Sequence, residues 1–269
     1  MATDGYGSRN RFWAAGGLLA LIALLALGAR VARADEVAAQ GRQVVDKWQN
    51  TVITVRLVIK TTMTMSGSQS EEQEEKTDAV GTVIDASGLT VMSLSQLDPG
   101  QAYKRMMGRR GAETPSFDVE SQVTDAKLRL ADGREVAAKV VLRDRDLDLA
   151  FLRPADKLAH GVAAVDLSQA AAPQLLDQVV TINRLRNSAD WAIAPRIDRI
   201  QAIIAKPRTI YVPQDSDEPG TPSFSLDGKI VGVTLVRMSQ AAGGGDDLGG
   251  LVVILPAAEV LEVAKQAGE

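Results

Sequence analysis

The chain contains no cysteine and a single histidine, His160. The absence of cysteine excludes disulfide bonds, a thiol nucleophile and thiolate metal ligands. One histidine leaves a zinc site short of imidazole ligands, because the sequence clusters no carboxylates around His160. We therefore expect no cofactor, no metal and a core that is stable without cross-links.

The chain also lacks an excess of basic charge: 30 lysines and arginines against 34 acidic residues give a net charge of -4 and an isoelectric point near 5.3. Nucleic-acid-binding domains carry concentrated basic surfaces, so the composition argues against a nucleic-acid partner. With 45% hydrophobic residues over 269 positions, the chain has enough apolar side chains for one large core or two smaller ones. The composition predicts a folded protein.

Residues 1–34 have the pattern of an export segment. A basic start is followed by an uncharged stretch of 18 residues at 12–29, and Ala32 and Ala34 have the spacing that signal peptidase prefers. The pattern predicts cleavage after Ala34. The alternative is an uncleaved membrane anchor, since about 20 apolar residues span a bilayer. In either case we expect residues 35–269 to be exported, as a periplasmic, secreted or membrane-tethered domain.

Short alternating runs rich in β-branched residues fill the mature chain and predict strands. Few aromatic residues, 4% of the chain, fit small barrels filled by aliphatic side chains. An Asp-Gly pair at 132–133 predicts a hairpin turn, and residues 154–173 have the composition of a linker. Helical spacing appears at 36–49 and at 256–266. The expected strands are 51–65, 80–85, 89–94, 122–130, 135–143 and 148–152, then 178–182, 191–204, 209–212, 229–238 and 250–255.

Two charged insertions follow strands of the first half. Residues 66–77 carry four glutamates, and residues 100–110 carry four lysines and arginines. Such runs are typical of solvated loops, and that is the interpretation we favour for both. The alternative is that they pair between protomers of a homo-oligomer or present a surface to an unidentified partner.

Four segments resemble trypsin-like serine proteases of the HtrA type. They are 81–97 (GTVIDASGLTVMSLSQL), 127–152 (KLRLADGREVAAKVVLRDRDLDLAFL), 219–233 (PGTPSFSLDGKIVGV) and 251–265 (LVVILPAAEVLEVAK). The resemblance implies an all-β chymotrypsin-like fold of two six-stranded antiparallel barrels with short terminal helices. It assigns the first barrel to about 50–153, the linker to 154–173, the second barrel to about 174–256 and a closing helix to 257–266. We expect no PDZ domain.

The same resemblance implies a degenerate catalytic triad. Registration of the motifs puts Ser95 where the family has its histidine base, Asp148 at the triad aspartate and Pro219 at the nucleophile. A hydroxyl is no base near neutral pH, and proline has neither a nucleophilic side chain nor an N–H for an oxyanion. The family's other oxyanion donor then falls on Asp217. We therefore expect no catalytic residues, and we interpret the chain as a pseudoprotease.

A second alignment, with a three-residue insertion before Leu226, makes Ser216 the nucleophile and the protein a divergent serine endopeptidase. That alignment still lacks the turn glycines and a histidine. A structural envelope component is the third alternative. Under the main interpretation, a peptide partner adds as a strand to the edge of the second barrel without being cut.

Overall fold

The computed structural model describes residues 36–65, 70–100, 104, 117–237 and 250–268. The predicted export segment and most of the basic insertion therefore lie outside the described residues. Within them, no helix combines the length and the apolar composition needed to cross a bilayer.

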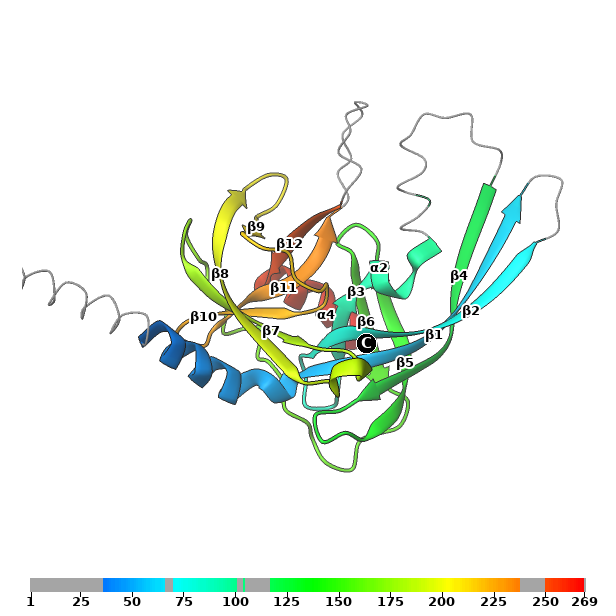
Figure 1. Cartoon of the computed structure of the whole chain (residues 1–269), viewed down its shortest axis with the longest axis horizontal. Coiled ribbons are helices and arrows are strands. Elements are labelled where there is room, and N and C mark those ends of the chain that lie inside the picture. The colour runs from blue at the N-terminus through cyan, green and yellow to red at the C-terminus, as the bar shows by residue number, and fades with distance from the viewer. Residues whose placement is uncertain (1–35, 66–69, 101–103, 105–116, 238–249, 269) are drawn as a thin grey trace, which may run out of the picture. The chain divides into compact units, whose positions relative to one another are not determined.

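Two closed six-stranded barrels make up the body of the protein, and every pairing between their strands is antiparallel (Figure 1). The first has the order β1-β2-β3-β6-β5-β4, and the second has the order β10-β11-β12-β9-β8-β7. This confirms the predicted chymotrypsin-like fold. The strands of the first barrel are β1 (Val52–Met65), β2 (Glu71–Val83), β3 (Thr90–Ser93), β4 (Phe117–Arg129), β5 (Glu135–Asp144) and β6 (Leu149–Pro154). Those of the second are β7 (Gln178–Arg184), β8 (Ile193–Ile204), β9 (Ile210–Pro213), β10 (Pro222–Ser225), β11 (Ile230–Arg237) and β12 (Leu251–Pro256).

The short helices include α2 (Leu94–Leu97), directly after β3, and α4 (Ala257–Ala264), directly after β12. The 3-10 turns are η1 (Gln49–Thr51), η2 (Asn187–Ala189) and η3 (Lys265–Gly268). A further helix spans residues 36–48. The helices predicted at 36–49 and 256–266 are therefore present, and the second continues into the 3-10 turn η3.

Local sequence explains the clearest strands. In β5, exposed and partly buried positions alternate along the whole strand, as expected where one face of a sheet packs on a core. The predicted hairpin turn is also present: Asp132 Oδ1 accepts the N–H of Arg134, and Gly133 has a φ of 85°. Glycine tolerates that left-handed backbone without steric cost, so the turn brings Arg129 opposite Glu135.

The hydrophobic core spans both barrels. Phe151 of β6 and Phe224 of β10 are the largest fully buried side chains, and they belong to one cluster. Trp48 stacks on Phe224 with ring centroids 5.4 Å apart, and its indole N–H donates to the carbonyl of Gly228 at 2.9 Å. These contacts fix β10 and the turn after it.

Two sequence predictions need correction. The acidic run was predicted as a loop, but Glu71–Val83 is strand β2, paired with β1 from end to end. Long-range pairing overrides the low strand propensity of glutamate there.

The four-residue strand β10 was not predicted. Asp148, placed at the start of a predicted strand, instead precedes β6 in a turn, with a φ of 58°.

Candidate functional site

Asp148 is held in the turn between β5 and β6, and only 5% of its surface is exposed. Its backbone carbonyl accepts the N–H of Leu94, the first residue of α2, at 2.9 Å. Four hydrogen bonds converge on its carboxylate. Oδ1 accepts the N–H and the hydroxyl of Ser95 at 2.8 and 2.5 Å. Oδ2 accepts the hydroxyl of Ser93 at 2.5 Å and the N–H of Val236 at 3.1 Å.

The donors come from both barrels. Ser93 ends β3, Ser95 lies in α2, and Val236 belongs to β11 of the second barrel. The structure therefore brings Ser95 and Asp148 together where β11 of the second barrel meets β3 and α2 of the first. Burial raises the pKa of Asp148 above its usual value, while the bonds from Ser93 and Ser95 and from Val236 act in the opposite direction.

The environment of Ser95 has a chemical consequence. Its hydroxyl donates its proton to a carboxylate, so it acts as a hydrogen-bond donor. A triad aspartate normally receives an imidazole N–H and thereby fixes the tautomer of the base. In this chain the carboxylate of Asp148 receives the hydroxyl and the N–H of Ser95. His160, the single histidine of the chain, is exposed in the segment between the barrels.

Pro219 lies in the loop between β9 and β10, and the N–H groups next to it already have acceptors. Glu218 N donates to Asp217 Oδ1 at 2.8 Å, and Gly220 N donates to the carbonyl of Thr234 at 2.7 Å. The proline has no N–H. An oxyanion hole needs N–H groups directed at an open position, and these residues direct theirs at other protein atoms.

Gly220 fixes how close this loop lies to the first barrel. Its φ is 94°, and a Cβ atom added there would lie 2.1 Å from the carbonyl oxygen of Val80. Its own carbonyl accepts the hydroxyl of Thr82 at 2.9 Å. Only glycine allows both this positive φ and this close approach to the carbonyl of Val80.

Ser216, the alternative nucleophile, is exposed and is flanked by residues with structural contacts. The N–H of Asp215 donates to the buried Asp198 at 3.1 Å. Asp217 forms an ion pair with Arg196 at 3.2 Å and accepts an amide N–H from Asn183 at 3.1 Å. Burial raises the pKa of Asp217. The carboxylates of Asp215 and Asp217 therefore flank Ser216 on either side in the sequence.

The structure also shows a polar network that sequence reasoning missed. Glu218 Oε1 accepts the side-chain N–H of Gln96 at 3.0 Å and pairs with Arg186 at 3.2 Å. Gln96 directly follows Ser95, so the network links α2, the loop at Pro219 and the segment after β7. Only tertiary structure unites these positions, because Gln96 and Glu218 are 122 residues apart. Nothing in the local sequence distinguishes them.

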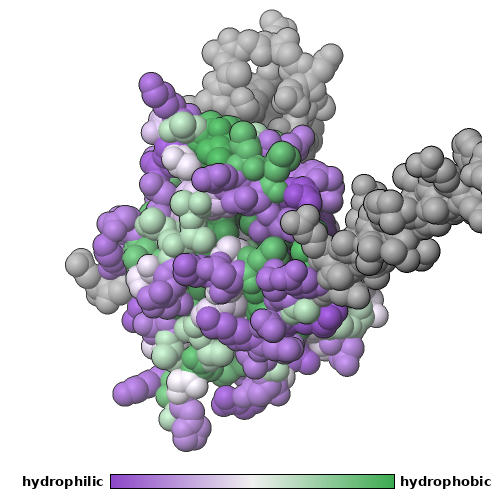
Figure 2. Space-filling view, turned by 90° about the vertical axis from the view of Figure 1, so that its left-hand side faces the viewer, coloured by the Kyte–Doolittle hydropathy of each residue, from purple (hydrophilic) through white to green (hydrophobic). Residues whose placement is uncertain are grey.

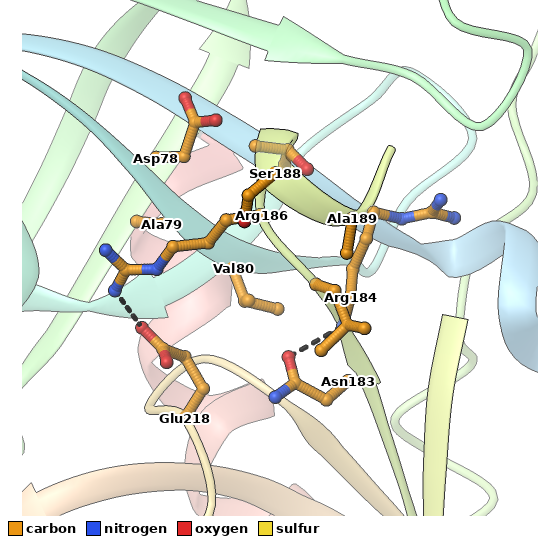
Figure 3. Close-up of a pocket in the computed structure, with 11 residues that line it drawn as sticks. Asp78, Ala79, Val80, Asn183, Arg184, Arg186, Ser188, Ala189 and Glu218 are labelled. Carbon is orange, nitrogen blue, oxygen red and sulfur yellow. Dashed lines mark hydrogen bonds and ion pairs between the residues drawn. The ribbon is translucent and has the colours of Figure 1, made fainter. Parts of the chain in front are cut away.

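Two of these residues, Arg186 and Glu218, border a cavity of about 290 Å³ (Figure 3). In the close-up, the Arg186 guanidinium extends to Glu218 along one side, and Asn183 and Arg184 lie together on another. Asp78, Ala79 and Val80 of β2 complete the side formed by the first barrel. In the part of the chain that is described, no group of three or more potential metal ligands is present.

The fold relates the chain to known structures, whereas its sequence does not. No family model matches the sequence, and no curated protein is similar enough to count as a relative. Two similar structures are of the HtrA-type protease AlgW, in a serine-to-alanine variant, with a tripeptide and with a decapeptide. The identities are 15% and 16%, and the TM-scores are 0.53 and 0.55.

Both matches cover 84% of this chain but only 62% and 65% of the AlgW chains. The chain thus spans less than two thirds of those neighbours. At this level of identity the likeness concerns the fold alone: two closed barrels arranged as in trypsin-like serine proteases.

Proposed function

We propose that this chain is a trypsin-like serine protease homologue that binds a peptide or protein partner without cutting it. The observation that carries the proposal is the bond from the Ser95 hydroxyl to Asp148 Oδ1. A hydroxyl occupies the contact through which the triad aspartate of an active enzyme orients its histidine. The carboxylate therefore has a structural role here and holds α2, β3 and β11 together.

Nucleophilic attack by serine needs a neighbouring base that accepts its proton. Ser95 is no such base near neutral pH. Loss of the base or of the nucleophile lowers turnover by about 10⁶-fold in serine proteases. The N–H groups around Pro219 already have acceptors, which also argues against catalysis, since the loss of one oxyanion donor lowers turnover by about 10²- to 10³-fold.

The expected position of the binding site, along the edge of the second barrel, remains a prediction, and backbone contacts of β11 bear on one part of that edge. A peptide was expected along the edge of the second barrel, but in β11 the N–H and carbonyl of Thr234 bond to Thr221 and Gly220. The N–H of Val236 bonds to Asp148. These groups are the ones that an added strand would need, so this part of the edge favours no peptide.

A peptide remains the partner class that the fold favours, because the AlgW structures contain a tripeptide and a decapeptide. The proposal also includes export, which rests on residues 1–34 alone: a cleaved signal peptide, or an anchor at residues 12–29. The protein would then act in the periplasm, in secreted form or at the membrane surface.

Proteolysis of casein tests the proposal. Residues 35–269 are purified and incubated with fluorescent casein beside an Asp148→Ala variant as control. We expect no cleavage above the buffer background for either protein. Reproducible cleavage that disappears in Asp148→Ala would show that a catalytic centre operates around this carboxylate, and the proposal would be wrong.

A further inference from the structure

Among the residues that the structure describes, one side of β2 has no strand partner over most of its length. The strand pairs with β1 from Glu71 to Thr82, but it pairs with β3 only through Thr82 and Val83. The first barrel thus closes at the last two residues of β2. Figure 1 shows the far ends of β1, β2 and β4 extending side by side away from β3 and β6.

This edge is accessible over residues 71–77. Glu71 to Lys76 are exposed, whereas the strand becomes buried from Ala79 onward. Asp78 is engaged, because its carboxylate accepts the indole N–H of Trp191 at 3.2 Å and pairs with Arg56 at 3.3 Å. Seven extended residues measure about 23 Å, enough for an average strand.

An open edge offers alternate N–H and C=O groups to any extended backbone beside it. Proteins commonly protect such edges with charged side chains, and here the charges have one predominant sign. Residues 71–77 contain four glutamates and one lysine. Glu72 pairs with Lys60 of the neighbouring strand at 2.8 Å. Four negative charges and one positive charge give residues 71–77 a net charge of -3, with Glu71 and Glu75 on one face of the strand and Glu72, Glu74 and Lys76 on the other.

The negative charge of residues 71–77 determines which kind of partner can bind this edge. Two copies of this chain joined through the edge would place glutamates opposite glutamates, and like charges directly opposed destabilise a sheet. An extended segment carrying lysine or arginine would place opposite charges there instead. An apolar partner has less support at this edge, because residues 71–76 are all exposed and five of the six are charged. Figure 2 shows another face, on the side of the second barrel, where hydrophobic patches are separated by hydrophilic side chains.

We propose that residues 71–77 of β2 bind a basic extended peptide by strand addition, with backbone bonds giving affinity and the glutamates giving selectivity. This inference deepens the proposed binding function and names its site. The experiment reads peptide binding alone, so its failure would leave the prediction of no proteolysis intact.

The probe is a short fluorescent peptide of alternating lysine and valine, added to residues 35–269 and followed by anisotropy. We expect binding that weakens as salt rises from about 0.05 to 0.5 M, because the screening length shortens severalfold. A peptide of alternating glutamate and valine should not bind. A lysine–valine peptide N-methylated at every residue should lose binding, since it has no backbone N–H to donate to the edge. Equal binding by either of these two peptides would overturn the proposal.

The matched variants are Glu74→Gln with Glu75→Gln in β2, and Glu259→Gln with Glu262→Gln in α4. Both pairs remove two negative charges; Glu74, Glu75 and Glu262 are exposed, and Glu259 is partly exposed. We expect the β2 pair to weaken binding about two- to fivefold for each glutamate, and the α4 pair to leave it nearly unchanged. Equal effects of the two pairs would overturn the proposal. So would salt-sensitive self-association that only the β2 pair abolishes, since that assigns the edge to a second copy.

Discussion

The hydroxyl of Ser95 lies 2.5 Å from Oδ1 of the buried Asp148, the residue that motif registration assigns to the triad aspartate. The same oxygen accepts the N–H of Ser95. The other carboxylate oxygen is occupied by Ser93 and Val236. A carboxylate with both oxygens satisfied in this way positions its neighbours but has no base to orient.

Ser95→Ala should destabilise the protein by about 1–3 kcal/mol, because it removes a hydrogen bond to a buried charged group and leaves that group partly unsatisfied. Urea denaturation followed by tryptophan fluorescence measures the change. Ser168→Ala is the matched control, since Ser168 donates to Asp166 at 2.6 Å at an exposed position. Water can replace that bond, so the control should lose less. Equal losses of stability in the two variants would mean that the buried Ser95 bond stabilises the protein no more than the exposed one.

The stability contribution of Asp148 should depend on pH in a defined direction. Burial raises its pKa in the folded state above 3.8, so the folded protein binds this proton more tightly than the unfolded chain. Its contribution is fully present below the unfolded value and is lost as pH rises through the folded value. Wild type should therefore gain stability relative to Asp148→Asn as pH falls from about 7 to about 4.

Asp227→Asn is the control for this pH series. Bonds from Ser225 and Lys229 lower the pKa of Asp227, so its contribution is present above the unfolded value and lost as pH falls. The advantage of wild type over this variant should therefore shrink over the same pH range. If both variants follow the same trend in denaturation measurements, the environment of Asp148 is not as described.

Gly220→Ala should destabilise the protein by about 2–5 kcal/mol. The added Cβ would overlap the backbone of Val80, and alanine is also strained at the left-handed φ of this position. Gly133→Ala tests the strain alone. Its φ is 85°, but the nearest atom to an added Cβ is the flexible Arg129 guanidinium at 3.3 Å. That variant should lose about 1–2 kcal/mol. Thermal unfolding compares the two, and a larger loss at Gly133 would contradict the close approach of the loop to β2.

Restoring two triad positions together, by Ser95→His and Pro219→Ser, should give little proteolysis. The reason is that Glu218 N and Gly220 N already donate to other protein atoms, so the loop offers few donors to an oxyanion. Casein hydrolysis measures the outcome. The same double variant with Asp148→Ala is the control. Strong hydrolysis that this third change removes would show that the loop retains an oxyanion hole.

The sequence predicted most strands because their alternation and β-branched residues agree with the fold. It missed the outer half of β2, because glutamates there are held in a strand by pairing with the distant β1. It missed β10, which has only four residues. Motif registration brought Ser95 and Asp148 into one hypothesis, and the structure places them in contact.

The contributions of Val236 and of the Gln96–Glu218–Arg186 network could not be predicted. Each depends on contacts between segments far apart in the chain, and none has a local signal. The positions of the N–H groups around Pro219 are equally a result of tertiary structure, since they depend on Thr234 of β11.

Labelling with a fluorophosphonate probe tests the central claim most directly, because the probe reacts only with a serine that a neighbouring base activates. Residues 35–269 and a Ser216→Ala variant are labelled side by side, with an active trypsin-like protease as positive control. We predict no labelling of either form of this protein above a heat-denatured sample. Labelling of the wild type would contradict the account, and its loss in Ser216→Ala would identify Ser216 as the nucleophile of a working protease.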